Sequence, residues 1–204
     1  MKRRLLLTIT LCGLLLKGFS QSNGTFEQDN YLGESRPFCW VPVLSYCTPD
    51  NWYIEARANY EAINSASLYF GKPFRKKGLI SYSITPIAGF VMGAFTGGSV
   101  GANVEMDYKK ISFSSQSQYT FSIENRATNF TYSWSDLTYQ LKECVSAGVS
   151  LQQTRGLFEK GILVRGVYKN LSIPLYVFNP TTSERYFVLG LNVEWGHEKK
   201  VKAV

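Results

Sequence analysis

The chain has 204 residues, with 22 Lys and Arg, 15 Asp and Glu and one His, for a formal net charge of +7. Residues 1–20 hold four of the basic residues and none of the acidic ones, so the rest of the chain carries 18 against 15, or +3. No concentrated basic patch remains, and the composition therefore excludes nucleic acid as a partner.

Residues 1–20 have the pattern of a secretory signal peptide. Basic residues 2–4 precede an apolar run, Leu5–Leu16, and a short segment then leads to Gln21. The run is shorter than the ~20 apolar residues of a transmembrane helix, so cleavage and export are expected ahead of an N-terminal anchor.

Three cysteines lie beyond the signal peptide: Cys39, Cys47 and Cys144. Because exported proteins meet an oxidising environment, we predict a disulfide between Cys39 and Cys47, with Cys144 left over. No spacing of Cys and His resembles a zinc site, and neither a metal nor a cofactor is expected.

Residues 21–50 contain Gly, Asn, Gln and Pro without sustained periodicity, which predicts an irregular periplasmic lead-in. Residues 51–195 instead alternate with period two, which is typical of strands with two different faces. In 100–108, for example, Val100, Ala102, Val104, Met106 and Tyr108 alternate with Gly, Asn, Glu and Asp. Residues 196–204 form a charged tail.

The alternating segments number about ten: 52–60, 65–72, 80–90, 100–108, 111–122, 130–140, 145–152, 161–168, 171–178 and 187–195. The count falls to eight if Ser65–Lys72 and its neighbour are not strands. Tight turns alternate with longer loops, as in outer-membrane barrels. We therefore predict an all-β fold, a closed antiparallel up-and-down transmembrane β-barrel of residues 51–195, in the bacterial outer membrane.

Alternation alone does not decide which face meets lipid. A soluble periplasmic ligand-binding barrel would turn its apolar face inward. The membrane assignment is favoured by strand lengths of nine to eleven residues and by aromatic residues near strand ends on the apolar face. These residues are Trp52, Tyr60, Phe90, Tyr108, Phe121, Tyr139, Tyr168 and Trp195.

Several segments resemble those of small outer-membrane β-barrel proteins of diderm bacteria. They are residues 59–61, 66–71, 132–137 and 176–180, and the resemblance spans most of residues 51–195. The last strand, Gly190–Trp195, resembles the C-terminal signal read by the barrel-assembly machinery, which implies that machinery and outer-membrane lipid as partners. The family's chains usually end at the final aromatic residue, whereas here nine residues follow Trp195.

The polar faces collect charged residues that would share the lumen. This predicted lumen cluster is Glu55, Arg57, Asn103, Glu105, Asp107, Asp136, Arg165 and Glu194. Such groups must pair, because an isolated charge away from water is costly. The cluster is interpreted first as a structural plug of salt bridges and second as a polar constriction or small-solute site.

No catalytic residues are predicted. The only histidine, His197, lies in the charged tail, and acid–base or nucleophilic catalysis usually relies on a histidine near its partner. We therefore expect an outer-membrane barrel with a structural, interaction or narrow-pore role. A soluble ligand-binding barrel ranks second and an outer-membrane hydrolase third.

Overall fold

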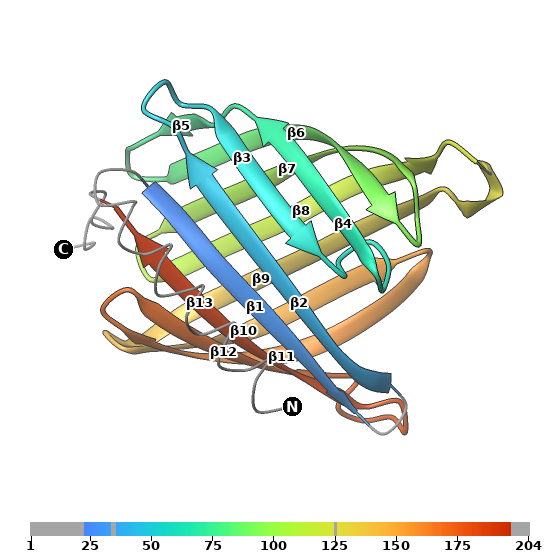
Figure 1. Ribbon diagram of the computed structural model, residues 1–204. Helices are drawn as coiled ribbons and strands as arrows, with labels where there is room; N and C mark the ends of the chain where they lie inside the picture. The colour runs from blue at the N-terminus through green and yellow to red at the C-terminus, as the bar shows by residue number, and fades with distance from the viewer. Residues whose placement is uncertain (1–22, 34–35, 125, 197–204) are drawn as a thin grey trace, which may run out of the picture.

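The computed structural model describes residues 23–33, 36–124 and 126–196, and the predicted signal peptide and most of the charged tail lie outside this part. Thirteen strands form one antiparallel sheet (Figure 1). They are β1 (Asn23–Gly33), β2 (Arg36–Cys47), β3 (Tyr53–Ala58), β4 (Ser65–Gly71), β5 (Phe74–Lys76), β6 (Ser81–Gly93), β7 (Gly97–Tyr108), β8 (Ile111–Ser122), β9 (Phe130–Lys142), β10 (Val145–Thr154), β11 (Leu157–Tyr168), β12 (Leu171–Phe178) and β13 (Tyr186–Trp195).

Twelve of these strands close into a barrel. Neighbours in sequence pair with one another, β1 pairs with β13, and β4 pairs with β6, which completes the ring and leaves β5 outside it. The predicted count of ten was therefore wrong, and so was eight. Each of the ten predicted segments is a strand, and the two additional ring strands are β1 and β2, within the segment expected to be irregular.

The predicted disulfide is also absent, and Cys39, Cys47 and Cys144 are free thiols. Cys39 and Cys47 lie on the same strand, β2, eight residues apart. At ~3.3 Å per residue this separates them by roughly 26 Å, far beyond the ~7 Å limit for a disulfide.

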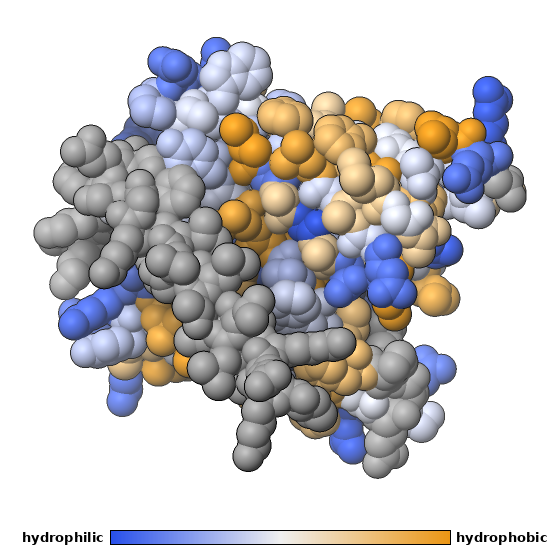
Figure 2. Space-filling model, in the orientation of Figure 1, coloured by the Kyte–Doolittle hydropathy of each residue, from blue (hydrophilic) through white to orange (hydrophobic). Residues whose placement is uncertain are grey.

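The apolar faces of the strands point outward. Leu137, Val149, Ile162 and Val164 are each about half exposed, whereas the polar residues that alternate with them, such as Ser150, are buried. Hydrophobic residues gather on the middle part of the visible surface, and hydrophilic residues are more frequent toward its two ends (Figure 2). This arrangement contradicts the soluble-barrel alternative, whose apolar faces would line the interior.

Three of the four prolines within strands lie where the pairing with one neighbouring strand has ended or is interrupted. Pro86 follows the last β4–β6 pair, which joins Gly71 to Ile87, and Pro42 lies just beyond the last β2–β3 pair. Pro174 lies in a gap of the β12–β13 pairing. Proline cannot donate to a ladder, so it is tolerated where no acceptor faces it.

The two ends of the barrel differ. The described chain ends and the tight turns at residues 109–110, 143–144 and 169–170 lie at one end, which we call the terminal end. The connections at residues 59–64, 94–96, 123–129 and 179–185 lie at the other, the loop end, together with one tight turn at residues 155–156. No helix of the described residues is long and apolar enough to cross a membrane.

Candidate functional site: the barrel lumen

The strand register places the predicted lumen cluster on the inner face of the wall. Glu55 and Arg57 come from β3, Asn103, Glu105 and Asp107 from β7, and Asp136, Arg165 and Glu194 from β9, β11 and β13. The structure divides this set into two hydrogen-bonded networks and a group of carboxylates nearer the terminal end.

The first network surrounds Arg57, whose side chain is fully buried. Its Nε donates to Glu55, and Nη1 lies 3.4 Å from Glu61 Oε1 and donates to Gln118 Oε1 at 2.6 Å. Because Gln118 belongs to β8, which is four strands from β3 around the ring, this network reaches across part of the lumen.

Aromatic rings and hydroxyls complete the surroundings of Arg57. Its guanidinium carbon lies 4.3 Å from the ring centre of Tyr60 and 4.2 Å from that of Tyr69. Glu61 also accepts hydrogen bonds from Ser67 (2.9 Å) and Tyr69 (2.7 Å). Nη2 of Arg57 is buried without a hydrogen-bond partner among the described residues, but the guanidinium pairs with two carboxylates and lies against two aromatic rings. These contacts are consistent with a structural role, because a buried charge is tolerated when it is paired and hydrogen-bonded.

The second network surrounds Asp136. Its Oδ1 accepts hydrogen bonds from Trp134 Nε1 (2.9 Å) and Ser150 (2.7 Å), and its Oδ2 accepts from Tyr176 (2.9 Å). Arg165 Nη2 lies 3.4 Å from the same Oδ2. Four different strands, β9 to β12, thus converge on one carboxylate.

Aromatic side chains cross the lumen toward the loop end. Trp134 packs edge-on against Tyr176 and Phe178, with ring centres 5.1 and 5.4 Å apart. Tyr60, from the β3–β4 connection, meets Tyr132 of β9 at 5.1 Å. These contacts join wall segments far apart around the ring, so we call them the aromatic layer; they narrow the lumen.

Tyr60 was expected on the outer aromatic girdle, and this prediction was wrong. Strand β3 ends at Ala58, and Asn59 has a positive φ of 59°. The turn reverses the period-two pattern, so the Tyr60 hydroxyl reaches Gln116 inside the barrel.

The lumen carries a large excess of carboxylates. Nine face inward among the described residues, against three arginines, Arg57, Arg75 and Arg165, for a formal charge of −6. The nine are Glu27, Asp29, Glu55, Glu61, Glu105, Asp107, Asp136, Glu159 and Glu194.

These carboxylates are not spread evenly along the lumen. Glu27, Glu105, Asp107 and Glu194 are exposed to water although they face inward, and three of them lie near the strand ends at the terminal end. Glu27 is close enough to interact electrostatically with Asp29, Glu55 and Glu105. We call this set of four exposed carboxylates the acidic vestibule.

Four lumen carboxylates were missed from the sequence. Glu27 and Asp29 belong to β1, where no strand was predicted, but their i, i+2 spacing with Tyr31 is a period-two signal. Glu61 follows the turn at Asn59. Glu159 lies between the predicted strands 145–152 and 161–168, but the structure places it in β11, where it accepts a hydrogen bond from Tyr186 at 2.9 Å.

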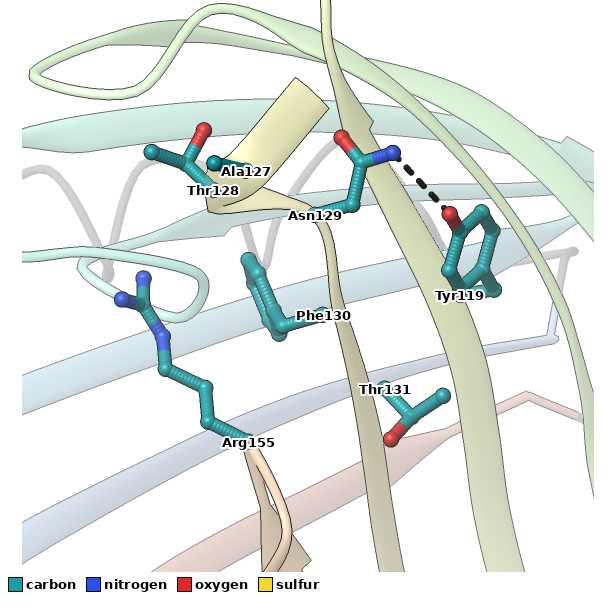
Figure 3. Close-up of a pocket in the computed structure, with 7 residues that line it drawn as sticks. All are labelled: Tyr119, Ala127, Thr128, Asn129, Phe130, Thr131 and Arg155. Carbon is teal, nitrogen blue, oxygen red and sulfur yellow. Dashed lines mark hydrogen bonds between the residues drawn. The ribbon is translucent and has the colours of Figure 1, made fainter. Parts of the chain in front are cut away.

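A cavity of about 460 Å³ lies at the loop end beside the β8–β9 connection (Figure 3). Its lining residues are Tyr119, Ala127, Thr128, Asn129, Phe130, Thr131 and Arg155. Asn129 donates to the Tyr119 hydroxyl at 3.0 Å, and the Arg155 guanidinium lies 4.8 Å from the Phe130 ring centre. None of the charged residues of the two networks lines this cavity. No group of at least three His, Cys, Asp or Glu side chains in the described chain has the geometry to hold a metal ion.

No protein-family model and no curated protein matches the sequence. Solved structures of the same fold do. A KdgM porin is similar with a TM-score of 0.58 and 11% identity, covering 84% of this chain and 99% of the porin. A NanC porin is similar with a TM-score of 0.51 and 10% identity, covering 85% and 100%. Identities this low establish the fold alone. Together with the outward apolar belt, this porin-like closed barrel places the chain in the bacterial outer membrane.

Proposed function

We propose that the barrel forms a narrow outer-membrane channel whose acidic lumen favours cations over anions. The formal charge of −6 on the inner face carries this proposal. A lumen lined by one sign of charge and enclosed by a low-dielectric wall concentrates ions of the opposite sign.

The aromatic layer supports a narrow path rather than a wide one. Contacts such as Tyr60 with Tyr132 and Arg57 with Gln118 join opposite or well-separated parts of the wall. A solute must pass between these groups, so we infer transport of inorganic cations or small organic cations.

The similar porins supply a contrast. One structure of KdgM was determined in complex with oligogalacturonate, an acidic oligosaccharide. The acidic wall of the present barrel would repel such a ligand, because like charges in a confined lumen cost energy. The shared fold therefore does not extend the proposal to acidic sugars.

Orientation and assembly are part of the proposal. Outer-membrane barrels carry short turns on the periplasmic side, so the terminal end and the acidic vestibule face the periplasm. Strand β13 ends at Trp195, and we retain the prediction that the barrel-assembly machinery reads this strand. No specific observation favours the hydrolase hypothesis, and the similar KdgM and NanC structures are porins.

Reversal potentials in planar lipid bilayers test the channel. In a tenfold KCl gradient, an ideally cation-selective channel reverses at about 59 mV, with the sign set by potassium. We expect the wild-type barrel to approach this value and the double variant Glu105→Gln, Asp107→Asn to fall toward zero.

Glu143→Gln provides a matched control, because Glu143 lies on the tight turn at residues 143–144, outside the lumen. It should leave the reversal potential unchanged. Anion selectivity, or a folded barrel without any conductance, would overturn the proposal.

A further inference from the structure

Residues 72–80 form an arm at the terminal end that is not part of the ring. Within it, β5 pairs only with β6 among the described strands. Every residue from Phe74 to Ile80 is exposed, including Phe74 (59%), Leu79 (77%) and Ile80 (48%). The arm also holds four basic residues, Lys72, Arg75, Lys76 and Lys77, and no acidic residue.

The arm continues the lipid-facing surface of the barrel. Phe74 pairs with Ile84 and Lys76 pairs with Tyr82, and both partners are exposed residues of the outer face of β6. Paired residues of an antiparallel sheet share a face, so Phe74 lies at the edge of the apolar belt and Lys76 just beyond it.

Arg75 and the neighbouring backbone attach the arm to the rim. The Arg75 guanidinium donates to Asn51 Oδ1 at 3.1 Å, and Asn51 Nδ2 donates to the Pro73 carbonyl at 2.8 Å. The exposed apolar and basic side chains are therefore held beside the membrane edge.

Three lysines at the terminal end, one in the arm and two in tight turns, each lie over an aromatic ring. Lys72, Lys109 and Lys169 each hold their ammonium nitrogen 5.3 Å from the ring centre of Trp52, Tyr108 and Tyr168, respectively. Rings of this kind lie at the headgroup level of a membrane, so the ammonium groups lie at the level of the phosphates.

We define the basic collar as seven lysines of the arm, the turns and the adjoining strand end at the terminal end. They are Lys72, Lys76, Lys77, Lys109, Lys110, Lys142 and Lys169, and the acidic residues in the connections at this end are Asp50 and Glu143. We propose that the basic collar, and the arm above all, binds the phosphate headgroups of anionic phospholipids in the periplasmic leaflet.

Two features support a lipid occupant rather than a protein or a soluble anion. The positive charge complements anionic headgroups, and clusters of Lys and Arg beside a membrane bind such lipids. The exposed Phe74 lies at the edge of the belt, where acyl chains would cover it, and Leu79 and Ile80 add exposed apolar surface to the same arm. The inference rests on the proposed orientation, with the terminal end toward the periplasm, and not on what passes through the lumen.

Lipid retention by the purified full-length barrel tests the inference. The protein is reconstituted in a mixture of phosphatidylcholine and phosphatidylglycerol, released in mild detergent, and its bound lipids are counted by native mass spectrometry. Each basic residue near an anionic surface strengthens binding about fivefold. We therefore expect the triple variant K72Q/K76Q/K77Q to lose at least about tenfold of the preference for phosphatidylglycerol.

The matched control is R126Q/R155Q/K160Q, which removes the same charge near the loop end. It should retain the preference, and both variants should keep the heat-dependent gel shift of a folded barrel. An unchanged preference in the arm variant, or an equal loss in the control, overturns the proposal.

Phosphate groups could come from an anionic phospholipid or from lipid A. Replacing phosphatidylglycerol with lipid A in the same experiment distinguishes these two sources. The proposal holds if lipid A retention does not respond to the arm variant. It is overturned if the basic collar retains lipid A more strongly than phosphatidylglycerol.

Discussion

Replacing Val164 with arginine tests whether the outer face of the barrel lies in hydrocarbon. Val164 is 52% exposed and points outward from β11, paired with Ala147 and Leu175 on neighbouring strands. A soluble protein would tolerate a charge at such an exposed position, whereas a membrane barrel would not.

The expected cost follows from the depth of the residue. Val164 lies four residues from Tyr168 and six from Phe158, the exposed aromatic residues at the two ends of β11. With about 3.3 Å per residue and a tilt of about 45°, these rings lie ~9 Å and ~14 Å away along the membrane normal. Their sum of about 23 Å matches the ~25 Å apolar band of such barrels, so Val164 is near mid-bilayer. There an arginine costs about 2–4 kcal/mol.

Reversible urea unfolding in lipid vesicles, followed by tryptophan fluorescence, measures this free energy. Val164→Leu should change it by less than about 1.5 kcal/mol, since the residue stays apolar. Lys160→Leu is a second control, because Lys160 lies outward on β11 only two residues from Phe158, and a charge near the interface costs no more than about 1 kcal/mol. If Val164→Arg cost no more than these controls, the outer face would not be in lipid.

Three further experiments test the buried ion pair, the close approach of two strands and the register of β2. Arg57→Met should lower the free energy of unfolding by about 3–5 kcal/mol, because both carboxylates that it pairs with would be left buried, and removing one of them as well should recover part of this loss. Gly148→Ala should destabilise by about 1–3 kcal/mol, since its Cβ would lie 2.0 Å from a carbonyl oxygen of β9, whereas Gly166→Ala should be neutral because nothing lies within 4 Å. Cys39 and Cys47 should both react with maleimide in the unfolded, unreduced protein, and a mass spectrum showing them disulfide-linked would contradict the β2 register.

Ten strands could be predicted because one face of each is apolar and the other polar. Strand β10, for example, sets Val149 and Leu151 against Ser150 and Gln152, and the structure buries the polar pair. A closed barrel requires this pattern, since one face meets lipid and the other meets a polar lumen.

The first two strands lack that contrast. On β1, Gln28 and Asn30 lie on the outer face, bonded to each other and to the Leu189 carbonyl, so neither face is apolar. On β2, the inner face carries Val41 and Val43, and the outer face is apolar as well, so the two faces do not differ in polarity. Pairing with neighbours determines these strands, and pairing partners are not visible in a local pattern.

The sequence pattern predicts which residues face the lumen, but not which of them contact one another. Alternation predicts that Asp136 faces inward, yet it does not show that Tyr176 and Arg165 from other strands converge on it. Glu61 was missed because a single turn at Asn59 shifts the period. Such turns depend on backbone conformations that asparagine adopts more easily than most residues.

The terminal end combines charges of opposite sign, and their placement explains how both can act. The carboxylates of the acidic vestibule, such as Glu105, point into the lumen, whereas Lys109 on the adjoining turn lies over the outward ring of Tyr108. A lysine beside lipid phosphates is largely neutralised by them, and its field fades within about 8 Å at physiological ionic strength. The carboxylates have no such counter-charge from the membrane, since the wall of the barrel separates them from the headgroups. In the proposed channel, an approaching cation therefore meets the field of the lumen rather than that of the rim. Neutralising the basic collar should then leave the proposed ion preference unchanged.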